Sequence, residues 1–190
     1  MGVFSDHVKK LYEYGLYCIP VGDQKNPLFK EWQINCDIAP REEFIDQLES
    51  KYTQVDRIGL CLGKSTGLVA FDWDYEYNPK KVSIDKATFD KEKRIIEQKV
   101  FSMLPQTPAR KTGKKGVTLF YRWNDSLSNL SADRNNVRLF FFLAWHKQTI
   151  LPPSLHSIQD GKPLYYKWEH LPLEECLNDI PEIERQNSIN

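Results

Sequence analysis

Two short apolar runs separated by a glycine-containing turn constrain the fold more than any other part of the sequence. The first run is Ile58–Leu62, and the second, Leu68–Phe71, continues directly into a segment that contains Asp72 and Asp74. This pattern predicts a β-hairpin whose second strand is buried and ends in acidic residues. Because side chains alternate between the two faces of a strand, Asp72 and Asp74 should point to the same face.

Two carboxylates on one face of a rigid strand are a candidate metal site. Their Cα atoms would lie roughly 6–7 Å apart. At that spacing both carboxylates can bind one or two divalent cations such as Mg²⁺ or Mn²⁺. The alternative is a solvated strand end with two surface acids, and the spacing of Asp72 and Asp74 alone favours that alternative.

The segment that precedes the next apolar run is strongly basic. It contains no acid and four cations, namely Arg110, Lys111, Lys114 and Lys115. Its glycines let the backbone approach a ligand and present N–H groups to a phosphate. We therefore predict a local site for nucleotide or DNA phosphates that includes Thr118, with a flexible basic hairpin tip as the alternative. The whole chain has 26 Lys and Arg against 26 Asp and Glu, which excludes a uniformly basic nucleic-acid surface.

A rigid turn follows the strand predicted at Gln148–Leu151. Two consecutive prolines fix the backbone there and position Ser154 and His156 at the end of the sheet. A hydroxyl and an imidazole at this place can hydrogen-bond a phosphate or a ribose. A nucleophilic Ser–His pair is a competing interpretation, but no GxSxG motif supports it. An ordinary surface histidine in a turn is the simplest alternative for His156.

The remaining periodicity predicts an α/β fold of the α+β kind, with an antiparallel or mixed sheet and helices packed on it. Helices are expected over the first 15 residues, from Pro40 through Leu48, and over residues 80–103. Further strands are expected at Leu16–Val21, Gly116–Trp123, Val137–Trp145, Gln148–Leu151 and Tyr165–Trp168. Residues 1–172 should form the domain, and the acidic, polar residues 173–190 should form a C-terminal tail or the start of a linker.

Hydropathy and cysteine spacing bear on the compartment. The four cysteines show no CxxC spacing, which argues against a zinc site of the usual pattern and against a disulfide scaffold. The longest apolar run, Leu139–Trp145, is too short to span a bilayer. The N-terminus has no secretory signal pattern. We therefore expect a cytoplasmic protein with no membrane partner.

Four segments in order resemble the primase–polymerase (prim-pol) domain of the archaeo-eukaryotic primase superfamily, as found in phage, plasmid and mobile-element replication proteins. They are the opening segment Tyr14–Trp32, the acidic segment Ile58–Asp74, the basic segment Lys114–Arg122 and the closing segment Gln148–Trp168. Each motif is weak alone, whereas four in the same order are fairly specific. The resemblance covers about Phe4 to Trp168.

The resemblance implies an RRM-like catalytic sheet and an enzyme of DNA replication, a primase and/or DNA polymerase. Such enzymes use two divalent metals, Mg²⁺ or Mn²⁺, to transfer nucleotides from NTPs or dNTPs onto a growing strand. It implies that Asp72 and Asp74 are catalytic metal ligands and that cations such as Lys114 and Lys115 hold the phosphates. The expected partners are single-stranded or primed DNA, the nucleotide, and a replicative helicase in the same or another chain.

Two positions depart from the family pattern and leave other functions open. Many members have a histidine where this chain has Thr118, and many have a third acid at a position that falls near Phe141 here. Asp133 is the nearest upstream acid. The second hypothesis is therefore a degenerate prim-pol domain that binds DNA or nucleotide, or recruits a helicase, without synthesis. The third hypothesis is an unrelated metal-dependent nuclease, but the Pro-Pro-Ser segment argues against it.

Overall fold

The computed structural model describes residues 2–114 and 116–183. Within these residues, the first half of the chain mixes helices with strands, and eight strands follow one another after α3. The elements are α1 (Val3–Glu13), β1 (Cys18–Pro20), η1 (Trp32–Cys36), α2 (Glu42–Lys51), β2 (Ile58–Leu62), β3 (Leu68–Trp73), α3 (Lys86–Met103), β4 (Arg110–Thr112), β5 (Val117–Arg122), β6 (Leu130–Arg134), β7 (Val137–Leu143), β8 (Lys147–Leu151), β9 (Leu155–Gln159), β10 (Lys162–Tyr165), β11 (Lys167–Trp168), α4 (Leu173–Cys176) and η2 (Leu177–Asp179). The predicted mixed α+β class is confirmed.

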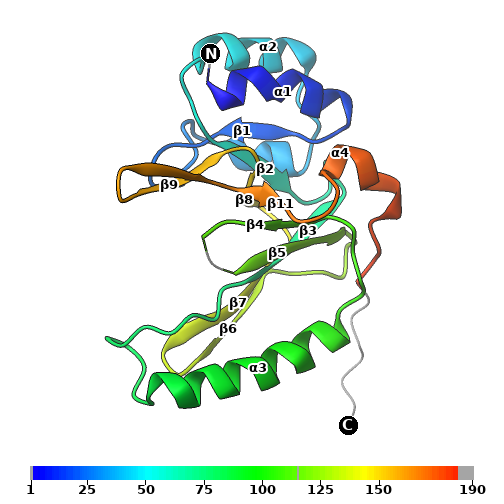
Figure 1. Cartoon of the computed structure of the whole chain (residues 1–190). Coiled ribbons are helices and arrows are strands. Elements are labelled where there is room, and N and C mark those ends of the chain that lie inside the picture. The colour runs from blue at the N-terminus through cyan, green and yellow to red at the C-terminus, as the bar shows by residue number, and fades with distance from the viewer. Residues whose placement is uncertain (1, 115, 184–190) are drawn as a thin grey trace.

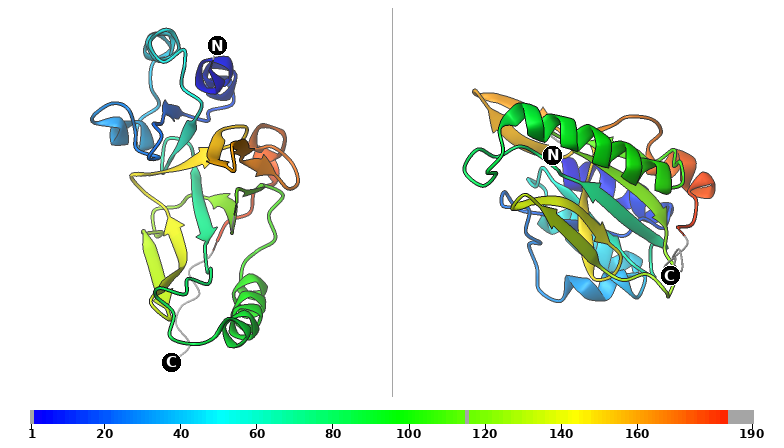
Figure 2. Two further views of the ribbon diagram at one scale, coloured as in Figure 1. Left: turned by 60° about the vertical axis from the view of Figure 1, so that its left-hand side comes forward. Right: turned by 90° about the horizontal axis from the view of Figure 1, so that it is seen from below.

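The strands form two main sheets that are stacked along the molecule. One has the order β1-β2-β8 and the other β11-β4-β5-β3-β7-β6, while β9 and β10 form a separate pair. The strand pairs are antiparallel. Helices α1 and α2 lie above the three-stranded sheet, and α3 lies below the six-stranded sheet (Figure 1). The view from below in Figure 2 shows α3 lying along that sheet.

The helices form where apolar side chains recur at helical spacing. Helix α1 buries Phe4, Val8 and Leu11, which are spaced by four and three residues and so share one face. Helix α3 begins at a capping residue, because the Asp85 carboxylate accepts a hydrogen bond of 3.0 Å from the Thr88 backbone N–H. Each helix therefore presents one apolar side to a sheet.

Strand β3 is buried on both faces. Leu68 and Ala70 belong to a core that they share with α1, α2 and α4, called here the N-terminal core. Val69, Phe71 and Trp73 belong to a second core, which they share with α3 and which is called here the α3 core. The alternation follows the two-residue period of a strand. The central strand therefore joins the two halves of the molecule.

The predicted hairpin between Ile58–Leu62 and Leu68–Phe71 is wrong. A single bridge between Gly63 and Leu68 joins the two strands at the turn. Beyond it, β2 pairs with β1 and β8, whereas β3 pairs with β5 and β7. All five residues of β2 are buried, so this strand is covered on both faces and takes partners that are distant in sequence on both edges. The turn therefore sends β3 into the other sheet.

The acidic C-terminal segment, which we expected to be a tail or linker, folds back onto the domain over its first part. Leu173, Cys176 and Ile180 are buried in the N-terminal core. The Pro181 carbonyl accepts a hydrogen bond of 2.9 Å from the Arg122 backbone N–H at the end of β5. Three apolar side chains at near-helical spacing give this segment enough contact area to pack. Residues 184–190 of the expected tail lie outside the described part of the chain.

Two further observations concern membrane-spanning helices and cysteines. Across residues 2–114 and 116–183, no helix combines the length and the apolar character needed to cross a bilayer. All four cysteines are buried free thiols.

The turn between β4 and β5 brings Gly116 against the end of β3. Gly116 has a φ of 66°, and a Cβ added there would lie 2.0 Å from the Trp73 carbonyl oxygen. We expect Gly116→Ala to lower the free energy of unfolding by more than about 2 kcal/mol, because it combines left-handed backbone with steric overlap. Urea denaturation measures this loss.

Gly67 provides the matched control. Its φ of 65° is nearly the same, but nothing lies within 4 Å of the position that its Cβ would take. Gly67→Ala should therefore lower the free energy of unfolding only by the cost of placing alanine in a left-handed backbone conformation, about 1 kcal/mol. Equal losses for the two variants would contradict the close approach of Gly116 to Trp73.

Candidate active site

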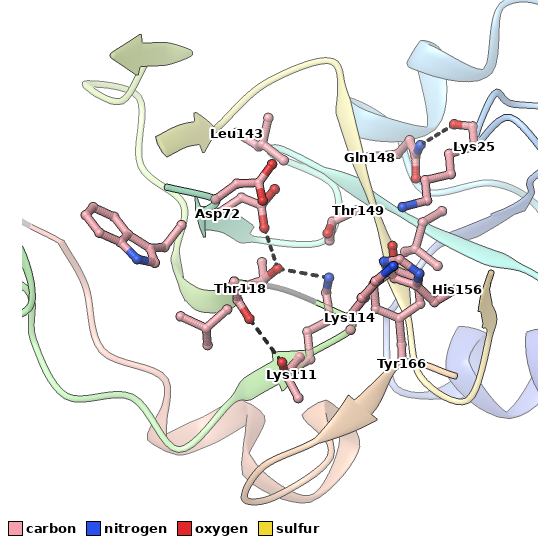
Figure 3. A pocket seen from close by; sticks show the side chains of 17 residues that line it. Lys25, Asp72, Lys111, Lys114, Thr118, Leu143, Gln148, Thr149, His156 and Tyr166 are labelled. Carbon is pink, nitrogen blue, oxygen red and sulfur yellow. Dashed lines mark hydrogen bonds between the residues drawn. The ribbon is translucent and has the colours of Figure 1, made fainter. Parts of the chain in front are cut away.

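A cleft of about 310 Å³ opens between the end of β3, the β4–β5 turn and the strands β8 and β9. Its walls carry ionisable side chains of both signs, namely Asp72, Asp74, Lys25, Lys111, Lys114 and His156. Figure 3 shows Asp72, Thr118 and Lys111 on one side of this cleft and Lys25, His156 and Tyr166 on the other.

The two acids reach the cleft because the N-terminal core ends beside them. Asp72 belongs to the face of β3 that carries Leu68 and Ala70, and it is the first residue on that face to be only half-buried. Asp74 follows the last residue of β3, and its backbone N–H donates a hydrogen bond of 3.2 Å to the Leu139 carbonyl. This bond extends the strand pairing by one residue and holds Asp74 beside the sheet. The structure therefore brings Asp72 and Asp74 to one cleft.

A row of cross-strand neighbours runs through Asp72 on this face of the sheet. Lys111 of β4 pairs with Thr118 of β5, Thr118 pairs with Asp72, and Asp72 pairs with Phe141 of β7. The Lys111 Nζ donates to Thr118 Oγ1 at 3.0 Å, and the Thr118 hydroxyl donates to Asp72 Oδ1 at 2.7 Å (Figure 3). This hydrogen-bonded chain fixes the orientation of the Asp72 carboxylate.

Lys111 is a buried cation, with 3% of its surface exposed. Burial disfavours the ammonium and lowers the pKa of Lys111 to about 8, although the nearby Asp72 charge opposes this shift. The Nζ also lies 4.9 Å from the centroid of the Tyr166 ring, within the range of a cation–π interaction. A buried charge of this kind costs stability, and its position in a cleft marks it as a functional candidate.

His156 lies on the same side of the cleft as Lys25 and opposite Lys111 (Figure 3). Its ring packs against Tyr166, with the centroids 4.9 Å apart. Burial, followed by the positive charges of Lys25 and Lys114, lowers the pKa of His156. A Cβ added at Gly113 would lie 2.5 Å from the His156 ring, so the glycine lets the basic turn approach this histidine. Together these groups form an electropositive wall that suits an anion.

Lys25 and Gln148 belong to the cleft although we did not predict them as site residues. Lys25 lies on the loop after β1, and its carbonyl accepts a hydrogen bond of 3.1 Å from the Gln148 side-chain amide. Its Nζ lies 5.5 Å from the centroid of the Tyr166 ring. The sequence contains a signal for Lys25 and Gln148, because both residues fall within segments that resemble the prim-pol family. Their place at the cleft depends on how a distant loop folds over the sheet.

Two predicted phosphate-binding residues, Ser154 and Arg110, are not among the cleft-lining residues. Ser154 is fully buried, and its hydroxyl accepts a hydrogen bond of 2.8 Å from the Ile58 backbone N–H, which ties the turn after β8 to the start of β2. Arg110 alternates with Lys111 along β4 and lies on the α3 side, where it pairs with Glu169. Lys115 lies outside the described residues.

The donor set fits a divalent cation that is shared with phosphate oxygens. Asp72 and Asp74 supply two carboxylates, and Mg²⁺ commonly takes one or two carboxylates together with water and substrate phosphates. Among the described residues, no group of three or more His, Cys, Asp or Glu side chains is placed to hold a metal. Phe141 occupies the cross-strand position beside Asp72, and Asp133 pairs with Arg138 at 2.5 Å on the outer strands instead.

Paired carboxylates beside a cationic wall are typical of proteins that bind phosphate esters. The chain matches the family described as Prim-Pol, bifunctional DNA primase/polymerase, N-terminal, over residues 9–183. Because this match spans nearly the whole chain, the protein belongs to that family, and the resemblance noted in the sequence is confirmed. Membership supports a primase/polymerase-type function in DNA replication, with DNA and nucleotides as substrates. No curated protein matches the chain significantly.

The lowered pKa of Lys111 predicts how stability depends on pH. Below about pH 8 this lysine is protonated in both states, and the cost of burying its charge is fully present. Between about pH 8 and 10.5 the unfolded chain binds the proton more tightly than the folded protein, so the free energy of unfolding should rise with pH, by at most about 1.4 kcal/mol per pH unit.

Lys111→Met should remove this rise, because methionine fills the same space without a titratable group. Urea denaturation across this pH range, for the variant and the wild type, measures the difference. Lys114→Met is the control, since Lys114 is exposed in the same turn and its loss should leave the pH dependence unchanged. If the free energy of unfolding rises equally with pH in Lys111→Met and in the wild type, the rise does not come from Lys111.

Proposed function

We propose that the cleft transfers nucleotides from NTPs or dNTPs onto the 3′ end of a template-paired strand, as a primase and/or DNA polymerase that depends on Mg²⁺ or Mn²⁺. The observation that carries this proposal is that the Asp72–Asp74 pair shares one cleft with three lysines and a histidine. Nucleotidyl transfer needs carboxylates to hold metal ions and cations to bind a triphosphate, and this cleft supplies both.

The residues would divide the work according to their chemistry. Asp72 and Asp74 would hold the divalent ions, which activate the 3′-hydroxyl and neutralise phosphate charge when bound. Lys25 and Lys114 would bind the triphosphate, and His156 would hydrogen-bond a phosphate or the ribose. In the reaction the 3′-oxygen forms a bond to the α-phosphorus, the bond to the bridging oxygen breaks, diphosphate leaves and the hydroxyl proton passes to solvent.

We expected a phosphate contact from Thr118, and its hydrogen bonds support a positioning role in addition. Its hydroxyl accepts from Lys111 and donates to Asp72. A hydroxyl can do both at once, so Thr118 satisfies the buried ammonium and orients the carboxylate. In this role Thr118 positions Asp72 and supports the metal site indirectly.

One observation favours a second function. Phe141 is the cross-strand neighbour of Asp72, at the position where many prim-pol proteins have a third acid. A domain without that acid could bind DNA or nucleotide, or recruit a helicase, without synthesis. We place the enzyme first because Asp72 is held by a hydrogen-bonded chain beside a cationic wall. From the resemblance alone we also propose a replicative helicase partner and a phage or plasmid setting, and from the cysteine spacing a cytoplasmic location.

Asp72→Asn tests the enzyme directly. Asparagine keeps the shape of the side chain and its acceptor for Thr118, but it removes the charge that would hold a metal ion. Primer extension with Mn²⁺ and labelled dNTPs should fall by at least about 100-fold, because metal stabilisation of the transition state is worth several kcal/mol. Binding of single-stranded DNA, measured by fluorescence anisotropy, should be equal or stronger, since an anion near the phosphates is lost.

The control is Asp125→Asn, which neutralises an exposed carboxylate in the turn after β5 and should leave extension unchanged. A wild type that binds single-stranded DNA but shows no extension with either NTPs or dNTPs would favour the degenerate domain. Equal extension by the wild type and Asp72→Asn would remove Asp72 from the reaction.

Lys25→Ala tests the cationic wall. We expect the affinity for a dNTP, measured by calorimetry with Mn²⁺, to fall about 3- to 10-fold, which corresponds to about 1 kcal/mol for an exposed charged contact. Lys99→Ala removes an exposed lysine from α3 and should have no effect. An unchanged affinity in Lys25→Ala would show that the triphosphate does not reach this side of the cleft.

A further inference from the structure

Phe141 leaves a large aromatic surface open beside the carboxylate pair. It is the direct cross-strand neighbour of Asp72, and 38% of its surface is exposed. The flanking Phe140 and Phe142 pack into the α3 core, so the strand already has its apolar anchors on the other face. The Arg138 guanidinium covers one face of the Phe141 ring, and the exposed remainder of the ring is available to a flat ligand that enters next to Asp72.

Arg138 adds a second flat group to the same surface. Its guanidinium carbon lies 3.9 Å from the centroid of the Phe141 ring, and its Nε lies 2.5 Å from an Asp133 carboxylate oxygen. A register shift between Ala132 and Asp133 of the paired strand lets Arg138 and Phe141 share one face. Aromatic rings and arginine planes are the surfaces on which unpaired bases of single-stranded nucleic acids stack.

The order of side chains across the sheet indicates which part of a substrate meets this surface. From β4 to β7 the order is Lys111, Thr118, Asp72 and Phe141. Lys111 thus lies on one side of Asp72 and the Phe141 ring on the other. In phosphoryl transfer the attacking oxygen and the leaving group are roughly in line on opposite sides of the phosphorus. With the diphosphate held on the β4 side, the 3′ end of the strand approaches from the β7 side.

We propose that Phe141 and Arg138 form a stacking platform for the 3′-terminal base of the strand that enters the cleft. This inference deepens the proposed function and rests on it for the direction of approach. The ligand class is a nucleic-acid strand with an accessible terminal base. The ring gives the base an apolar face, and the ion-paired guanidinium adds a second flat surface for stacking.

A double-mutant cycle between protein and DNA tests the platform without any need for synthesis. The probe is a fluorescein-labelled single-stranded oligonucleotide of about 12 nucleotides, prepared with either a normal or an abasic 3′-terminal nucleotide. We expect the abasic end to weaken binding to the wild type on the order of 5-fold or more, as for the loss of one stacked base. Phe141→Leu should bind both oligonucleotides equally and as weakly as the wild type binds the abasic one.

Three further variants sharpen the result. Phe141→Trp keeps an aromatic face and should keep the sensitivity to the abasic end, whereas Arg138→Gln should reduce it. Tyr14→Leu is the matched control, because Tyr14 is 46% exposed at the end of α1 and lies outside the cleft. Thermal unfolding of each variant verifies that the fold is intact, and Phe141→Trp keeps the test valid if Phe141→Leu is unstable.

Two outcomes would overturn the platform. One is equal sensitivity to the abasic end in the wild type and Phe141→Leu, which includes a wild type that binds neither oligonucleotide. The other is a loss of dNTP affinity in Phe141→Leu with no change for the oligonucleotides, since the ring would then serve the incoming nucleotide. Primer extension by the wild type tests the proposed function separately. If the wild type extends a primer but Phe141→Leu keeps the sensitivity to the abasic end, only the stacking platform is contradicted. If Phe141→Leu loses that sensitivity but the wild type extends no primer, only the proposed enzyme is contradicted.

Discussion

Strand β3 packs against a core on each face, and this limits the positions along the strand at which a polar side chain can reach solvent. Leu68 and Ala70 are covered by the N-terminal core, and Val69 and Phe71 by the α3 core. On the face of β3 that carries Leu68 and Ala70, Asp72 is the first side chain that the N-terminal core leaves partly exposed. The carboxylate is therefore placed by the extent of the core on a rigid strand, which gives a reacting group better precision than a loop does.

The charges at this position are balanced across three strands. Lys111, Thr118 and Asp72 come from β4, β5 and β3, and two hydrogen bonds join them in the side-chain layer. A buried ammonium without such a partner would be strongly destabilising. This hydrogen-bonded series ends at the Asp72 carboxylate in the cleft wall. Any cation that binds Asp72 therefore also changes the electrostatic potential at Lys111. Binding and stability are thus linked at this site.

Local periodicity was enough to predict the three longer helices, the buried strands β2, β3, β5 and β8, and the approach of Asp72 and Asp74 to one cleft, because these depend on neighbouring residues. It did not predict the short or exposed strands β4, β6, β9 and β10. It could not predict the partners of β2, since Cys18–Pro20 and Lys147–Leu151 lie far away in the sequence. The same limit applies to side chains with two possible uses. The Ser154 hydroxyl turns inward to a backbone N–H, and no local pattern distinguishes this from a phosphate contact. The burial of Lys111 likewise depends on strands that meet only in the folded chain.

The measurement that tests the account most directly is a crystal structure with Mn²⁺ and a non-hydrolysable dNTP, with the ion located by its anomalous scattering. The account predicts an ion held by Asp72 and Asp74 and a triphosphate that extends from it toward Lys114 and His156, on the β4 side of the cleft. An ion bound elsewhere, or a triphosphate that extends toward Phe141 on the β7 side, would contradict it.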